Sequence, residues 1–398
     1  MIEFSTRLGA LPGYPLAELP ATKRRLIAEG MDIIDLGAGD NDAPPPEVAV
    51  QSLQRAVEDP AYSKYGFQQG LAEFRRATSD YMHRRFGHRM DPVTETLPLI
   101  GSKEGIAHLP LAVVNPGDVT IVPEPGYQAY LGGSILAGAE PFITPLEARH
   151  EFLVALDEIP PDVLRRAKLL FLNYPNNPTA AVATHEYLER VVATCRHHDI
   201  LLAYDNAYSD LTFDGYRAPS IFEIPGARDV AIEFFSLSKS FSMTGWRLGW
   251  AAGRPELIAA LTRVKSYMDT GPFLAVQRAG ADVLDHAESL VEPIRRELQR
   301  RRDAAVVALR DAGFPVESPK AAMYLWVALP SGIGSAAFAR RALETYGILV
   351  LPGSAFGPAG EGFFRIALTV DSARLQEAVG RLAHALEALR GAEVAAQA

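Results

Sequence analysis

Between residues 96 and 252, short apolar runs alternate with longer segments whose apolar residues recur every three or four positions. Short apolar runs are typical of buried strands, and the longer spacing is typical of helices. This alternation predicts an α/β fold with a largely parallel sheet that is covered by helices on both faces. Ligands of such folds bind beyond the carboxyl ends of the strands, so the polar residues found there are candidates for a site. The expected strands are Thr96 to Ile100, Val119 to Val122, Lys168 to Leu172, Ile200 to Tyr204, Val230 to Phe235 and Leu248 to Ala252.

Two helices are expected before this alternation begins. Pro46 can open the first helix, with Val50, Leu53 and Val57 on its inner face, and the second ends at Gly87.

The pattern changes after about residue 270, where long charged helices are followed by strands near AAMYLWVAL, ILVLP and FFRIAL and by a final helix. A length of 398 residues also exceeds one domain of roughly 150 residues. We therefore expect a large domain over residues 46–270 and a smaller α+β domain over residues 271–398, which is joined by an N-terminal segment, residues 1–45.

Composition excludes several classes of function. The chain has 39 lysines and arginines against 48 aspartates and glutamates, and a net charge of −9 argues against nucleic acid as a partner. Its single cysteine cannot form an internal disulfide or a cysteine-based metal site, and we expect no metal. We find neither a signal peptide nor a run of apolar residues long enough to span a membrane, so we expect a cytoplasmic protein without a membrane partner.

The densest polar stretch, SLSKSFSMTGWRLGW, directly follows the expected strand that ends at Phe235. Lys239 in this stretch can form a Schiff base with an aldehyde cofactor, although it can also be an ordinary surface lysine. Hydroxyl and guanidinium groups nearby suit a phosphate dianion, as does the start of the helix that follows Ile100. As alternatives, Ser102 can be a helix cap only, and Arg247 can belong to a structural ion pair. The candidate anion-binding residues are Ser236, Ser238, Arg247, Gly101, Ser102 and Lys103.

Further polar residues follow two other strands. Asp205 can keep a pyridine nitrogen protonated, and Tyr208 and Asn177 can donate hydrogen bonds to a phenolate oxygen. Taken singly, Asp205 can be a helix cap and Asn177 a turn residue, but three strand ends that supply a carboxylate, an amide and a lysine together favour a cofactor site. Tyr127 can lay its ring over such a cofactor or pack in the core.

These residues resemble a known family. The motifs NPT at Asn177, DNAYSDL at Asp205, SLSKSFSMTGWRLGW, and FFRIAL with Arg365 are similar to those of the class I and II aminotransferases, which are pyridoxal-phosphate enzymes of fold type I. The resemblance implies pyridoxal 5'-phosphate on Lys239, Asp205 at its pyridine nitrogen and Arg365 at the α-carboxylate of the substrate. Asn177 would then contact both cofactor and substrate.

The same resemblance implies contributions from outside the strand ends. Tyr65, in SKYGFQQG, would reach the cofactor phosphate of a second subunit, which implies a homodimer with shared active sites. Gly39, in DLGAGDND, matches an N-terminal segment that closes over the substrate. Ala180 stands where family members often have glycine.

The segments LIGSKEGIAHLPLAVVNPGD, KLLFLNYPNNPTAAVA and IEFFSLSKSFSMTGW further resemble LL-diaminopimelate aminotransferases, enzymes of lysine biosynthesis, and their relatives that act on aspartate, alanine and succinyldiaminopimelate. We expect ping-pong transfer of an amino group from an amino acid to a 2-oxo acid such as 2-oxoglutarate. LL-diaminopimelate is the expected donor, and Lys103 and Glu104 can fix its distal end. As alternatives, Lys103 can only add charge at the phosphate, and Glu104 can only favour the start of the helix.

Three alternatives stay open at this point. The chain can be an aspartate or alanine aminotransferase, because cofactor residues do not report the side chain of the donor. It can also be a β-lyase or oxidase of the same fold. A regulatory module that only binds the cofactor would need a DNA-binding domain, but residues 1–45 show no helix-turn-helix pattern.

Overall fold

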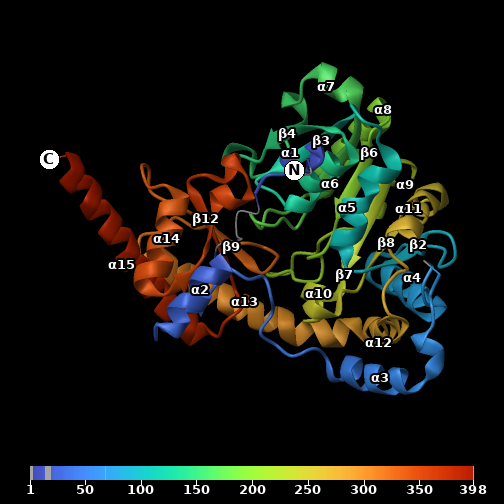
Figure 1. The fold of residues 1–398 in the computed structure, drawn as a ribbon, viewed down its shortest axis with the longest axis horizontal. Helices are drawn as coiled ribbons and strands as arrows, with labels where there is room; N and C mark the ends of the chain where they lie inside the picture. Colours follow the sequence, from blue (N-terminus) through green and yellow to red (C-terminus); the bar gives the residue numbers. More distant parts are fainter. Residues whose placement is uncertain (1–2, 14–18, 68, 398) are drawn as a thin grey trace.

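The computed structural model describes residues 3–13, 19–67 and 69–397. Its centre is a seven-stranded sheet in the order β2-β8-β7-β6-β5-β3-β4 (Figure 1). β8 pairs antiparallel with both of its neighbours, whereas the pairs from β7 to β4 are parallel. The expected α/β sheet is thus confirmed. The strands are β2 (Thr96–Leu99), β3 (Val119–Glu124), β4 (Glu140–Pro145), β5 (Ala167–Asn173), β6 (Leu201–Asp205), β7 (Ala231–Ser236) and β8 (Gly249–Gly253).

Helices cover both faces of this sheet because its strands are apolar on both sides. In β5, for example, Leu169 and Phe171 belong to one core cluster, and Leu170 and Leu172 belong to the opposite one. The first face is covered by α5 (Ser102–Val113), α6 (Gln128–Ala137) and α11 (Pro255–Met268). The second is covered by α4 (Ala72–Phe86), α8 (His185–His198) and α12 (Leu274–Asp285), with α3 (Glu47–Glu58) packed on α12.

The two expected early helices form, but the inner face of the first was predicted wrongly. α3 begins after Pro46, yet its buried residues are Ala49, Ser52 and Ala56. Val50 and Val57 are 37% and 51% exposed. Small side chains let the α3 backbone approach α12 closely, and this packing decides which face of the helix is covered.

A second, smaller sheet lies beside the first (Figure 1), in the order β11-β12-β9 with antiparallel pairing. Its core takes in the last helix and the far half of the long α13. A short parallel pair joins β1 to β10, and Leu26 packs with Leu343 and Leu349, so residues 19–36 pack with the C-terminal part. The short helix α1 (Thr6–Ala10) instead contacts α6. The strands are β1 (Ile34–Asp35), β9 (Tyr324–Ala328), β10 (Ile348–Leu349), β11 (Leu351–Pro352) and β12 (Phe363–Ala367), and the helices are α2 (Leu19–Ala28), α13 (Ala287–Asp311), α14 (Ser335–Tyr346) and α15 (Ser372–Gln397).

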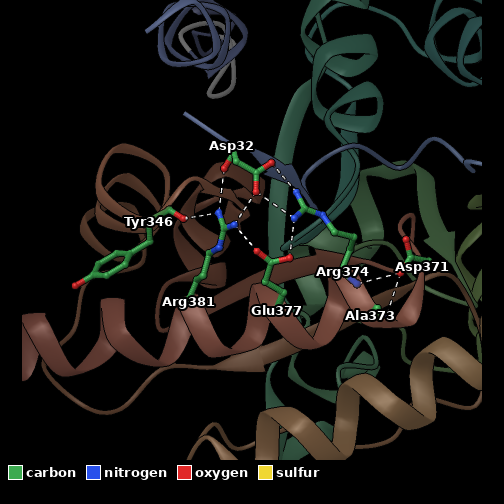
Figure 2. A network of polar contacts seen from close by, with 7 residues as sticks. All are labelled: Asp32, Tyr346, Asp371, Ala373, Arg374, Glu377 and Arg381. Atoms are coloured by element: carbon green, nitrogen blue, oxygen red, sulfur yellow. Dashed lines mark hydrogen bonds and ion pairs between the residues drawn. The ribbon is translucent and has the colours of Figure 1, made fainter. Parts of the chain in front are cut away.

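An exposed ion network holds the start of β1 against α15 (Figure 2). Asp32 lies 2.8 Å from the guanidinium of Arg374 and 2.6 Å from that of Arg381, and both arginines also contact Glu377. Hydrogen bonds from the two arginines lower the pKa of Asp32 to about 2.

Where the two domains divide stays a prediction. α12 lies beyond residue 270 but packs against α3 and α4, and α13 continues from that core into the second one. Residues 1–2 and 14–18 of the expected N-terminal segment lie outside the described residues. Within the described part of the chain, no helix combines the length and the apolarity that crossing a membrane requires.

Candidate active site

A cavity of about 360 Å³ opens where the carboxyl ends of β3, β5, β6 and β7 meet the start of α5 and the smaller sheet. The side chains that follow neighbouring parallel strands lie at one edge of a sheet, so separate sequence motifs meet there. Apart from Gly101, Glu104 and Tyr65, all the candidate residues line this cavity: Gly39, Ser102, Lys103, Tyr127, Asn177, Asp205, Tyr208, Ser236, Ser238, Lys239, Arg247 and Arg365.

Asp205 is the last residue of β6 and its side chain is almost completely buried. Its Oδ2 accepts a hydrogen bond of 2.8 Å from the hydroxyl of Tyr130, whereas no partner for Oδ1 is found among the described residues. Burial raises the pKa of Asp205 to about 6, and the hydrogen bond from Tyr130 opposes that rise. A buried carboxylate with a free oxygen is suited to a cationic N–H group placed in the cavity.

Lys239 lies in α10 (Leu237–Ser240), the short helix that directly follows β7. Its Nζ donates a hydrogen bond of 2.6 Å to the carbonyl oxygen of Gly39. A Cβ atom on Gly39 would lie 2.4 Å from the hydroxyl oxygen of Tyr324, so the close approach of this segment requires glycine. The structure therefore brings the amine and the N-terminal segment into direct contact.

The candidate anion site is formed by the turn before α5 and the start of β8. Arg247 has a left-handed φ of +54° and donates from Nη1 to the carbonyl oxygen of Thr244. A Cβ on Gly101 would lie 2.4 Å from Arg247 Nη2, so the guanidinium lies against this turn. Gly101, and not Ser102, is the N-cap of α5, and no side chain caps that helix. No ion pair of Arg247 is found in the described part of the chain, so its structural alternative has no support.

Arg365 lies on β12 at the opposite wall of the cavity, and Asn177 accepts a hydrogen bond of 2.7 Å from its Nη1. Its Nη2 donates to the carbonyl oxygen of Gly37. The guanidinium carbon lies 4.1 Å from the ring centroid of Tyr324 and 5.0 Å from that of Phe356, as in cation–π contacts. These contacts fix the plane in which the arginine can meet a carboxylate.

Tyr208 contacts the same wall. Its hydroxyl lies 3.1 Å from that of Tyr324, and burial raises the pKa of Tyr208 well above its usual value. The hydroxyl therefore stays protonated near neutral pH and can act as a donor. Tyr127 faces Lys103, whose Nζ lies 5.7 Å from the centroid of the tyrosine ring.

Two expected residues lie elsewhere. Tyr65 is 71% exposed and does not line the cavity of its own chain. The expectation that Glu104 would meet a substrate is wrong, because its carboxylate is bonded to Lys265, His108 and the backbone N–H of Ile100. Ala180 has a left-handed φ of +59°, a conformation in which glycine is favoured.

Three aromatic residues of this site were not predicted from the sequence: Tyr130, Tyr324 and Phe356. The first belongs to the turn-to-helix motif PEPGYQAY, three residues after Tyr127 and so on the same face of α6. The three-residue spacing between Tyr127 and Tyr130 could therefore have been used to predict that both side chains lie at the site. Tyr324 and Phe356 meet Arg365 only through the folding of the smaller sheet, and no local spacing indicates that contact.

Comparisons with known proteins agree with one another. The family model for aminotransferases of class I and II matches residues 31–382. The LL-diaminopimelate aminotransferase of Moorella thermoacetica is 46% identical over 380 residues, which cover 96% of this chain and 97% of that protein. The enzyme of the same name from Aquifex aeolicus is 46% identical over 382 residues, which cover 96% of this chain and 99% of that protein.

Solved structures are similar over the same extent. A probable N-succinyldiaminopimelate aminotransferase from Thermus thermophilus superposes with a TM-score of 0.89 at 38% identity, covering 94% of this chain and 100% of that one. A single mutant of Thermus thermophilus aspartate aminotransferase gives a TM-score of 0.90 at 29% identity, with 97% and 100% coverage.

Proposed function

Since the chain belongs to the class I and II aminotransferases, we propose that it moves an amino group from LL-diaminopimelate to a 2-oxo acid, with pyridoxal 5'-phosphate as its cofactor. The aminotransferase activity follows from the family, and the donor is proposed from the relatives of that name at 46% identity. The acceptor proposed is 2-oxoglutarate.

The donor set of the cavity fits this cofactor, and the free Oδ1 of buried Asp205 is the observation that carries the proposal. When bound, pyridoxal phosphate supplies an aldehyde that condenses with amines and a pyridinium ring that withdraws electrons. Asp205 would accept the N–H of that ring and so keep its nitrogen protonated. Ser102, Ser238 and Arg247 would hold the phosphate through hydroxyl, backbone and guanidinium donors.

Lys239 is proposed to hold the cofactor and then to carry a proton to and from the α-carbon of the substrate. Its Nζ lies on the Gly39 carbonyl in this structure, so the amine is already directed into the cavity. Tyr208 and Asn177 would donate to the phenolate oxygen. Because the Oδ1 of Asn177 is engaged by Arg365, its Nδ2 is the donor that it retains.

Arg365 is proposed to bind the α-carboxylate of every substrate. Its two terminal nitrogens are oriented by Asn177 and Gly37, and its buried Nε has no partner among the described residues. A planar guanidinium that is held between two rings is prearranged for a planar carboxylate. Lys103 lies at the cavity wall and is the remaining candidate for the distal end of the donor, as Glu104 is engaged elsewhere.

We also propose that the functional unit is a homodimer in which Tyr65 reaches the cofactor phosphate of the partner subunit. The exposed position of Tyr65, outside the cavity of its own chain, supports a role between subunits. Phe67 is 73% exposed and lies beside it, with ring centroids 6.1 Å apart. Such exposed aromatic pairs are enriched where subunits meet.

The test loads the purified protein with pyridoxal 5'-phosphate and mixes it with single amino acids, while the absorbance of the cofactor reports the half-reaction. LL-diaminopimelate should exceed alanine and aspartate by about one to two decades in kcat/KM, because a buried polar end without a partner costs roughly 1 to 3 kcal/mol. A higher rate with alanine or aspartate would overturn the proposed donor. Release of ammonia and pyruvate without an acceptor would indicate a lyase instead.

A further inference from the structure

A buried ion network lies behind the turn that begins α5. Lys265, on α11, has no exposed side-chain surface. Its Nζ lies 2.8 Å from Glu104 Oε2 and 3.0 Å from Asp269 Oδ1. An ammonium group is rarely buried so completely unless carboxylates compensate it, and here two carboxylates contact Lys265.

Glu104 connects this lysine to the turn. Its Oε2 also accepts a hydrogen bond of 3.1 Å from the backbone N–H of Ile100, and its Oε1 lies 2.9 Å from Nδ1 of His108. Burial raises the pKa of Glu104, but the contacts with His108 and Lys265 outweigh that rise and hold it below its usual value. The residue that fixes the backbone before Gly101 is thus an anion held by Lys265.

The turn has little room to shift. A Cβ on Gly101 would lie 2.4 Å from Arg247 Nη2, and a Cβ on Gly249 would lie 2.9 Å from the backbone nitrogen of Ser102. A displacement of a few tenths of an ångström at Ile100 would therefore change the direction of the Ser102 N–H and the position of the Arg247 guanidinium. Groups that bind an anion by geometry lose affinity when their supports move.

We propose that Lys265 is a positioning residue for the phosphate end of the cofactor site and acts by holding Glu104 against the backbone of Ile100. This inference rests on the proposed function, because the phosphate is that of pyridoxal 5'-phosphate. Lys265 does not line the cavity, so it would not touch a cofactor bound there. Its second partner, Asp269, accepts a hydrogen bond of 2.7 Å from the N–H of Gly271, whereas the backbone N–H of Ile100 is bonded to Glu104.

The test compares two ligands that differ only in the phosphate, pyridoxal 5'-phosphate and pyridoxal, by titrating each into cofactor-free protein. Lys265→Met removes the ammonium group but keeps an unbranched apolar side chain. The preference for the phosphorylated ligand should fall about tenfold or more, which corresponds to the roughly 1.4 kcal/mol expected for one lost contact of a charged group. The affinity for pyridoxal should change less than about twofold, because its aldehyde and ring meet unaltered residues.

Asp269→Asn is the matched control, since it removes the other carboxylate of Lys265 and leaves Glu104 and Ile100 joined. Its preference for the phosphorylated ligand should stay at the wild-type value. If circular dichroism shows that Lys265→Met does not fold, the double variant Lys265→Met/Glu104→Gln removes both buried charges and should show the same loss of preference.

The outcomes separate the two proposals. An unchanged preference in the folded lysine variant, or an equal loss in Asp269→Asn, overturns the positioning role alone. A wild-type protein that does not prefer pyridoxal 5'-phosphate to pyridoxal overturns the proposed cofactor and this inference together.

Discussion

Replacing Asp205 with asparagine should stabilise the cofactor-free protein while it lowers the activity. The aspartate is buried, and burial raises its pKa from 3.8 to about 6. Because the folded state then binds the proton more tightly than the unfolded state, stability falls as the pH rises from about 4 to about 6 and is constant above that range. At about 1.36 kcal/mol per pKa unit, the ionisation of Asp205 lowers the free energy of unfolding by about 3 kcal/mol at pH 7 and by only about 0.5 kcal/mol at pH 4.

Asparagine has nearly the same shape, and its Oδ1 still accepts the hydrogen bond from Tyr130. Asp205→Asn should therefore raise the free energy of unfolding of the cofactor-free protein by about 3 kcal/mol at pH 7. The same variant no longer holds the ring nitrogen protonated, so its loaded form should lose roughly 3 kcal/mol or more of barrier lowering, a rate loss of about two decades.

The assay is urea unfolding of cofactor-free wild type and variant at several pH values between 4 and 7.5. Asp157→Asn is the control, because that carboxylate is 87% exposed and its loss should change the stability by less than about 0.5 kcal/mol at every pH. Equal stability of wild type and Asp205→Asn at pH 7 would refute the argument, as would a difference that does not shrink toward pH 4.

Arg365→Lys should raise KM and lower kcat/KM for all donors alike, because an ammonium group lacks the planar pair of N–H donors that matches a carboxylate; a loss for one donor only would place the residue at the distal end of the pocket. Mixing inactive Tyr65→Phe and Lys239→Ala proteins should restore part of the activity through hybrid dimers with one intact site, and no recovery after proven subunit exchange would contradict shared sites. Ala180→Gly should raise the free energy of unfolding by about 0.5 to 1 kcal/mol, because it relieves a left-handed φ of +59°. Its control, Ala193→Gly on the exposed face of α8, should lower that free energy by about 1 kcal/mol, and the same sign in both variants would exclude backbone strain as the cause.

Most of the central sheet could be predicted from the sequence, because its strands are apolar on both faces and each is followed by an abrupt polar segment. The six expected strands are present to within one or two residues at each end. β4 was not predicted because its residues, EPFITP, are mostly exposed or half-buried and do not form a continuous apolar run. The same abrupt polar segments located Asp205, Asn177 and Lys239 at one edge of the sheet, and their chemical roles stay predictions.

Contacts between distant segments could not be predicted in this way. Glu104 occupies the first turn of α5, where local reasoning assigns an acid to the helix dipole, and nothing near it indicates Lys265, which is 161 residues away. The buried face of α3 was predicted wrongly because two of its faces have helical spacing, one with the large residues Val50 and Val57 and one with the small residues Ala49, Ser52 and Ala56. Only the packing against α12 decides which of these faces is buried.

The 25-residue helix α13 packs in both of the cores that form the walls of the cavity. At 1.5 Å per residue it is about 37 Å long, so tilting it by about 5° at one end moves the other end by about 3 Å. Its first turns, with Val291, pack in the core that carries Lys239, and Leu298 packs in the core that carries Arg365. Between them Pro293 interrupts the backbone hydrogen bonds, which lowers the resistance to bending at that point. A bend of about 5° at Pro293 would move the end of the helix at Asp311, about 27 Å away, by about 2 Å, and with it the core that carries Arg365 relative to the core that carries Lys239.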